Sequence, residues 1–197
     1  MADKNPVSNG VTSKSLRFYG RRKGRPLRQS MQRRLDEVLP EFVFDPSISA
    51  DIQFGRHADC YLEIGFGGGE HLAGLAAAMP DCDFIGAEPF INGVASLLRH
   101  IDEQQLGNIR IWPDDVRIIL PTIDAASLAG VFIMFPDPWP KRRHAGRRIL
   151  QPTFCRWIIT SKHQFATGSY YRSKLIKKSR LENPPTRMAS FWPWIRK

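Results

Sequence analysis

Short apolar segments alternate with amphipathic ones between residues 58 and 140, and this alternation constrains the fold more than any other feature of the chain. Strands are expected at 61–66, 84–87, 109–112 and 131–135, and helices at 69–79 and 91–105. Strand–helix–strand order predicts parallel strands joined by right-handed crossovers. The predicted fold class is therefore α/β, a doubly wound, mostly parallel sheet of the Rossmann-like type. One more short helix is expected at 30–39, after which Pro40 and Pro46 should break the chain.

Acidic residues stand near the ends of four successive predicted strands. They are Glu63, Glu88, the pair Asp114 and Asp115, and Asp137. Ligands of doubly wound sheets lie beyond the carboxyl ends of the strands, which all meet at one edge. The sequence therefore predicts a single ligand site at this edge.

The first of these strand ends is rich in glycine. Gly65, Gly67 and Gly69 let the backbone turn sharply and approach a ligand closely, although a plain turn is the alternative. A dinucleotide pyrophosphate would require glycine where this chain has Glu70, whose carboxylate would repel phosphate. Glu63 instead suits a positively charged ligand, and the sulfonium and amino groups of S-adenosylmethionine carry such charge.

The next two acids have the positions expected of nucleoside contacts. Glu88 ends the second strand, where such sites place an acid that accepts hydrogen bonds from ribose hydroxyls. Asp115 follows the third strand and could accept from an adenine amino group. A solvated turn residue or a helix cap is the alternative for Asp115, and Asp114 is the weaker candidate.

After the fourth strand, three prolines within five residues stiffen a loop that carries Asp137 and Trp139. Such a loop can hold its side chains in few orientations, which suits a site. A basic cluster follows directly, and a solvated turn ahead of a helix near residues 151–152 is the alternative for it. Its members are Lys141, Arg142, Arg143, His144, Arg147 and Arg148.

Charge is segregated along the 197 residues. Residues 1–34 contain ten Lys and Arg against one Asp, residues 35–140 four against seventeen acids, and residues 141–197 fifteen against one Glu. Two basic arms around an acidic centre indicate a surface that binds a polyanion, with nucleic acid ahead of basic tails that only solvate the chain. Residues 14–28 combine Lys and Arg, which could contact phosphates, with the rings of Phe18 and Tyr19, which could stack on bases. Residues 1–13 are polar and are expected to be disordered.

No apolar segment approaches the ~20 residues of a membrane span, and the polar N-terminus lacks the core of a signal peptide, so a cytosolic protein is expected. Cys60, Cys82 and Cys155 are scattered without the spacing of a disulfide framework or a zinc site, and no other spacing suggests a metal.

Four segments of this chain resemble the bacterial tRNA (guanine-N7)-methyltransferases, a family of S-adenosylmethionine-dependent enzymes. The resemblance extends from about residue 16 to 159, and its last segment is the most specific. The segments are Arg17 to Arg25, Leu62 to Glu70, Gly86 to Pro89, and Phe135 to Lys141.

The resemblance implies S-adenosylmethionine as cofactor and tRNA as partner. It implies that Glu63, Gly65, Gly67, Glu88, Asp115 and Asp137 bind the cofactor, with Asp137 also catalytic. It further implies that Lys141 contacts the substrate, and that Arg143, His144, Arg147 and Arg148 contact RNA. Guanine N7 is a lone-pair acceptor that needs no deprotonation, so the enzyme mainly has to align the reacting atoms. Whether the protein is a monomer or a dimer stays open.

The C-terminus departs from this family. The family's fifth strand ends in an acid where this chain has Gly168, and two further strands are not recognisable, so an incomplete sheet is expected. The predicted organisation is a basic arm at 1–34, a methyltransferase domain at 35–160 and a divergent segment at 161–197. Two alternatives to an active enzyme remain: an inactive RNA-binding remnant and a nicotinamide-dependent oxidoreductase.

Overall fold

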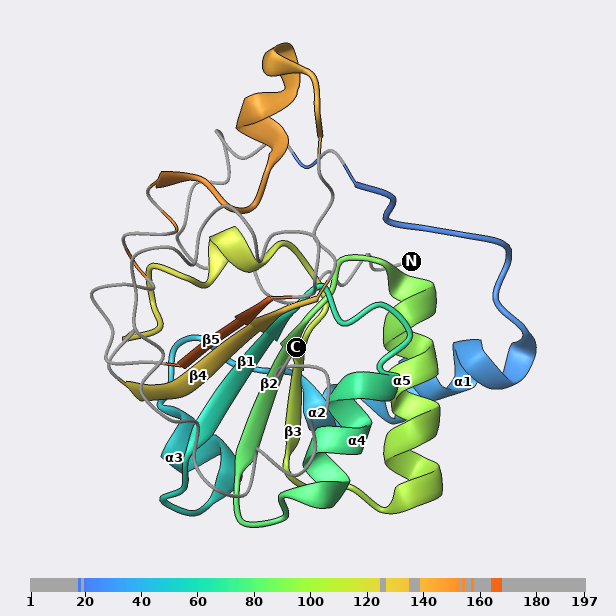
Figure 1. The fold of residues 1–197 in the computed structure, drawn as a ribbon. Coiled ribbons are helices and arrows are strands. Elements are labelled where there is room, and N and C mark those ends of the chain that lie inside the picture. The colour runs from blue at the N-terminus through green and yellow to red at the C-terminus, as the bar shows by residue number, and fades with distance from the viewer. Residues whose placement is uncertain are drawn as a thin grey trace, which may run out of the picture.

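A five-stranded parallel sheet forms the centre of the protein (Figure 1). The computed structural model describes residues 18, 20–124, 127–134, 139–152, 154 and 157, and the backbone alone of 164–167. The strands lie in the order β3-β2-β1-β4-β5, and each neighbouring pair is parallel. This confirms the predicted α/β class. The strands are β1 (Cys60–Ile64), β2 (Asp83–Ala87), β3 (Ile109–Trp112), β4 (Leu128–Ile133) and β5 (Gln164–Thr167).

Helices connect and cover the strands. The predicted helices correspond to α1 (Gln29–Glu37), α4 (Glu70–Ala78) and α5 (Ile91–Gln104). The helix α1 ends before Pro40, as expected, but Pro40 itself lies in the first turn of a second short helix, α2 (Leu39–Phe42), where a missing N–H costs no helical hydrogen bond. The remaining short elements were not predicted. They are α3 (Ala50–Phe54), η1 (Val116–Ile118) and η3 (Arg142–Arg147).

Alternate residues of β1 supply the two cores of the protein. Tyr61 packs under α4 and α5 with Phe84 and Phe132, and its ring centroid lies 5.6 Å from that of Phe84. Leu62 and Ile64 face the opposite core, which includes Ile119 and Val131. A strand buried on both faces is typical of a doubly wound parallel sheet.

The strand β5 pairs with β4 in register Phe132↔Ala166. It lies beyond residue 160, the predicted end of the methyltransferase domain. Residues 168–197, where the family's further strands were sought, lie outside the described residues, as do residues 1–13. The predicted division into three segments stays a prediction.

Two of the three cysteines fall in the described part. Cys60 is buried, and burial raises the pKa of its thiol to about 12. Burial also raises the pKa of Cys82. Both are free thiols with little tendency to ionise, and Cys155 lies outside the described part. Among the helices of the described residues, none has the length and apolar character needed to cross a membrane.

Candidate functional site

The carboxyl edge of the sheet begins with the glycine loop, residues 65–69, between β1 and α4. Gly65 and Gly67 have φ of 73° and 58°, in the left-handed region that favours glycine. A Cβ placed on either residue would meet no described atom within 4 Å. As far as the described residues go, this face of the loop is therefore open, whereas α5 packs closely against its other side.

Glu88 fixes the glycine loop against the end of β2. Its Oε2 accepts a hydrogen bond of 2.9 Å from the amide of Gly67, and its Oε1 accepts one of 2.9 Å from the amide of Phe90. The residue is 9% exposed. Burial raises the pKa of Glu88 above the usual range for glutamate, and the two amide bonds oppose this rise. Each oxygen retains acceptor capacity for a ligand hydroxyl.

Close packing between α5 and the glycine loop supports this arrangement. A Cβ on Gly93, in the first turn of α5, would lie 2.1 Å from the carbonyl oxygen of Gly67 and 3.5 Å from Cγ of Glu88. Only glycine allows the helix to approach the loop so closely.

Glu63 lies at the same edge but is 1% exposed. Its Oε2 lies 2.8 Å from Nδ1 of His71, on the first turns of α4, and the His71 ring meets Phe132 edge to face at a centroid distance of 5.7 Å. His71 was not among the residues predicted for the site. The sequence feature that could have indicated it is its position eight residues after Glu63, at the start of the helix that follows the glycine loop.

Asp115 is a helix cap, the alternative left open by the sequence. Its carboxylate accepts from the backbone amide of Arg117 and pairs with the Arg117 guanidinium, and it is 6% exposed. The neighbouring Asp114 instead pairs with Arg22, at 2.8 Å between Nη2 and Oδ1. The adenine-binding role of Asp115 stays a prediction. In that role the adenine would share the Asp115 carboxylate with Arg117.

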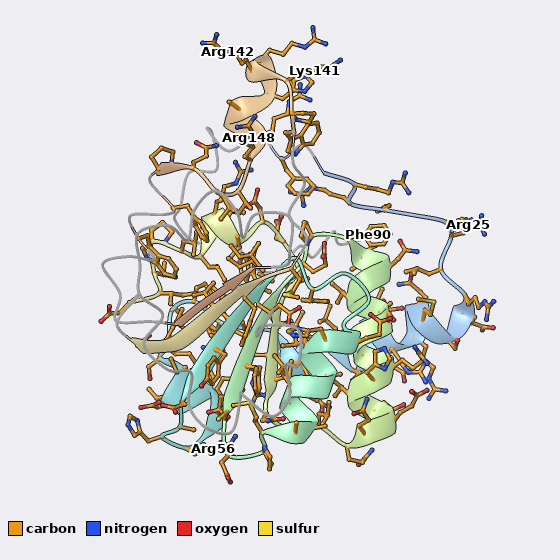
Figure 2. The ribbon with its side chains drawn as sticks, in the orientation of Figure 1. Arg25, Arg56, Phe90, Lys141, Arg142 and Arg148 are labelled. Atoms are coloured by element: carbon orange, nitrogen blue, oxygen red, sulfur yellow. The ribbon has the colours of Figure 1, made fainter. Side chains whose placement is uncertain are left out.

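The N-terminal basic arm reaches this edge as well. The amide of Ile91 donates to the carbonyl of Arg22 at 3.0 Å, so the arm is bonded to the start of α5. Figure 2 shows Arg25 and Phe90 beyond the upper end of the sheet, on the side of α5. The sequence predicted basic residues for nucleic acid here but gave no sign that the backbone docks on the domain.

A second basic element stands above the same edge. Figure 2 shows Lys141, Arg142 and Arg148 on the projecting segment that contains η3. Trp139 has a φ of 38°, and its carbonyl accepts from Nε and Nη2 of Arg148 at 3.1 and 2.9 Å. The Arg147 guanidinium lies 4.9 Å from the centroid of the Trp139 ring, which His144 contacts edge to face.

These contacts divide the predicted RNA-binding residues. Lys141, Arg142 and Arg143 are exposed, whereas His144, Arg147 and Arg148 are partly buried against Trp139. Desolvation lowers the pKa of His144, and electrostatic repulsion from Arg147 and Lys141 lowers it further, so its ring is neutral over more of the physiological range.

The structure thus brings Glu63, Glu88 and Asp115 to the ends of three adjacent strands. Asp137 lies outside the described residues, and the predicted cavity that it would share with Glu63 and Glu88 stays a prediction. In the part of the chain that is described, no group of three His, Cys, Asp or Glu could hold a metal ion. An open glycine loop bordered by buried carboxylates fits an organic cation with hydroxyl groups, as the sequence predicted for S-adenosylmethionine.

Comparisons with known proteins identify the family of the chain. A family model described as "Putative methyltransferase" matches residues 57–161. The chain is 49% identical over 148 residues to the tRNA (guanine-N(7)-)-methyltransferase of Rhodospirillum rubrum, covering 71% of this chain and 58% of the relative. It is 44% identical over 156 residues to the protein of that name from Paramagnetospirillum magneticum, covering 76% and 66%.

The chain therefore spans less than two thirds of the length of these relatives. A solved 16S rRNA methyltransferase is similar over 74% of this chain and 71% of its own, at 15% identity and a TM-score of 0.40. The family model covers more than half of the 197 residues. The chain therefore belongs to the methyltransferase family that this model describes, and it is similar to proteins named tRNA (guanine-N(7)-)-methyltransferase.

Proposed function

We propose that the chain transfers a methyl group from S-adenosylmethionine to N7 of a guanine in tRNA. The observation that carries this proposal is the Glu88 carboxylate, fixed by the amide of Gly67 beside the open face of the glycine loop. Basic segments at 21–25 and 141–148 flank the acidic edge and supply charge for RNA phosphates. The names of the relatives supply the base and the position. A tRNA substrate implies a cytoplasmic protein.

In this proposal the carboxylates bind the cofactor. Glu88 would accept hydrogen bonds from the ribose hydroxyls, and the buried charge of Glu63 would favour the amino group and sulfonium. Gly65 and Gly67 would leave room for the cofactor against the backbone. Asp115, already bonded to Arg117, would contribute its remaining acceptor capacity to the adenine.

When bound, S-adenosylmethionine supplies an electrophilic methyl carbon whose bond to sulfur breaks as N7 attacks. The residues need remove no proton from N7, because the attacking lone pair is free in guanine. Their work is to align the guanine with the methyl group, an effect worth ~7–11 kcal/mol in well-oriented reactions. Asp137 is proposed to orient the guanine edge or the cofactor amine. Lys141 and the basic residues around η3 would hold the RNA.

A methylation assay tests the proposal. The purified chain is incubated with bulk tRNA and S-adenosylmethionine carrying a labelled methyl group, and the RNA is digested to nucleosides. Label in 7-methylguanosine is the expected product, and Asp137→Ala should reduce it by at least ~100-fold if the residue orients a reactant. Label at any other base position, or undiminished methylation by the variant, contradicts the corresponding assignment.

The assay also separates the alternatives. An inactive remnant would retain tRNA on a filter without transferring label. The nicotinamide alternative has no supporting observation, and the position of Glu70 at the start of α4 opposes a pyrophosphate there.

Cofactor binding should weaken on acidification at a higher pH than an ordinary glutamate would cause. Burial raises the pKa of Glu88, so its carboxylate is protonated, and loses acceptor capacity, before an exposed glutamate would be. A raised carboxyl pKa favours the folded state at low pH, so Glu88 itself does not promote acid unfolding. Calorimetric titration with S-adenosylmethionine from about pH 7.5 to 5 measures the effect.

The control is Glu88→Gln, which keeps the shape of the side chain but cannot titrate. It should bind the cofactor more weakly at neutral pH, with a much flatter pH dependence. Circular dichroism confirms that both proteins stay folded over the range. Equal pH slopes for the two proteins would exclude Glu88 as the titrating group.

A further inference from the structure

The basic arm is anchored to the domain through one amide side chain. Oδ1 of Asn92, in the first turn of α5, accepts from the amide of Gly24 at 2.7 Å, and its Nδ2 donates to the carbonyl of Arg25 at 2.8 Å. The two bonds engage both functions of the amide and hold consecutive residues of the arm. Asn92 therefore fixes both the position and the direction of the arm's backbone at Gly24 and Arg25. These two residues precede Asn92 by 68 and 67 positions in the sequence.

Two neighbouring contacts show that the arm fits this position closely. A Cβ on Gly24 would lie 2.9 Å from Cζ of the Phe90 ring and 3.1 Å from Oδ1 of Asn92. The carbonyl of Arg22 accepts from the amide of Ile91. The arm is therefore docked along residues 90–92, directly after the Glu88 carboxylate that holds the glycine loop.

The charged side chains of the docked segment remain available. Residues 21–25 are all exposed. The Arg22 guanidinium pairs with Asp114, whereas the described residues offer no acidic partner to Arg21, Lys23 or Arg25. A short stretch of backbone held by three hydrogen bonds, with three cations exposed to solvent, has the form of a phosphate-contacting element.

We propose that Asn92 is a positioning residue that holds the basic segment 21–25 beside the cofactor edge, so that Arg21, Lys23 and Arg25 contact phosphates of the bound tRNA. This inference rests on the proposed function. Asn92 acts through the arm and touches neither the reacting atoms nor the cofactor. Its loss should weaken RNA binding, because ordering an unanchored arm has an entropic cost that its phosphate contacts only partly offset, so that some of these contacts are no longer made.

Asn92→Ala tests the proposal, with Gln104→Ala as matched control because it removes an exposed amide from the far end of the same helix. Asn92→Ala should raise the Kd and KM for tRNA roughly tenfold and lower the slope of log Kd against log salt by about 1 to 2. The cofactor Kd and the kcat at saturating tRNA should stay within about twofold of wild type. Gln104→Ala should match wild type throughout.

A variant without the three cations distinguishes loss of positioning from a general effect of Asn92→Ala on folding. In a chain carrying Arg21→Gln, Lys23→Gln and Arg25→Gln, Asn92→Ala should have no further effect on tRNA affinity, because the groups that it positions are gone. Additive losses would overturn the proposal, as would a fall in kcat or cofactor affinity with unchanged tRNA binding.

Docking itself is measured without any RNA. Trypsin should cleave after the basic residues at 21–25 faster in Asn92→Ala than in wild type or Gln104→Ala, at equal thermal stability. Equal cleavage rates would show that Asn92 does not anchor the arm. Failure of the proposed function is distinct, since it would appear as wild-type protein that neither binds nor methylates tRNA while the difference in proteolysis persists.

Discussion

Gly93→Ala is expected to destabilise the protein by about 1–3 kcal/mol and to weaken S-adenosylmethionine binding by at least ~10-fold. The added methyl group would lie 2.1 Å from the carbonyl oxygen of Gly67, and the obstacle is backbone that no side-chain rotation can remove. Relief requires α5 to move away from the glycine loop. Because Glu88 bonds to the amides of Gly67 and Phe90, this movement also separates the two groups that fix its carboxylate.

Gly74→Ala is the matched control. Gly74 is an exposed glycine of α4, and a Cβ there would meet nothing within 4 Å among the described atoms. This substitution should stabilise the protein by ~0.5–1 kcal/mol, because alanine is the better helix former. Thermal unfolding and calorimetric cofactor binding measure both variants. Equal stabilities for Gly93→Ala and wild type would show that α5 and the glycine loop do not pack as described.

The sheet was predictable because β1, β2 and β4 are buried along nearly their whole length and read as short, mostly apolar runs. The predicted strand at 109–112 and the observed β3 coincide, and α5 differs from its prediction by one residue. The short helices were harder to predict from the sequence. In α2, Pro40 reads as a breaker, and only its place in the first turn makes it compatible with a helix.

The site was partly predictable for a different reason. Parallel strands bring their carboxyl ends to one edge, so Glu63 and Glu88 could be grouped from spacing alone. Their partners could not, because His71 and the amide of Phe90 depend on how a helix meets a strand end. Asn92 had no local signal, since the residues that it holds are almost 70 positions away.

A large fall in turnover is expected from Arg148→Met. Both Nε and Nη2 of Arg148 donate to the carbonyl of Trp139, whose φ of 38° is a strained conformation for a non-glycine residue. Without these bonds, Trp139 should relax and change the direction of the chain that leads back to Asp137. We expect kcat to fall by ~100-fold, since misplacement by about 1 Å can have this effect. Single-turnover methylation measures it.

Arg142→Met provides the contrast, because Arg142 is exposed on η3 and has the same stem and charge. It should raise the tRNA Kd about fivefold and lower the salt slope by about 1, with kcat unchanged. The sequence grouped Arg148 with the RNA contacts, and a direct contact would make the two variants alike. A fall in kcat confined to Arg148→Met would instead show that the Arg148 guanidinium supports Trp139. If the two variants have equal salt slopes and equal kcat, Arg148 is a direct RNA contact like Arg142.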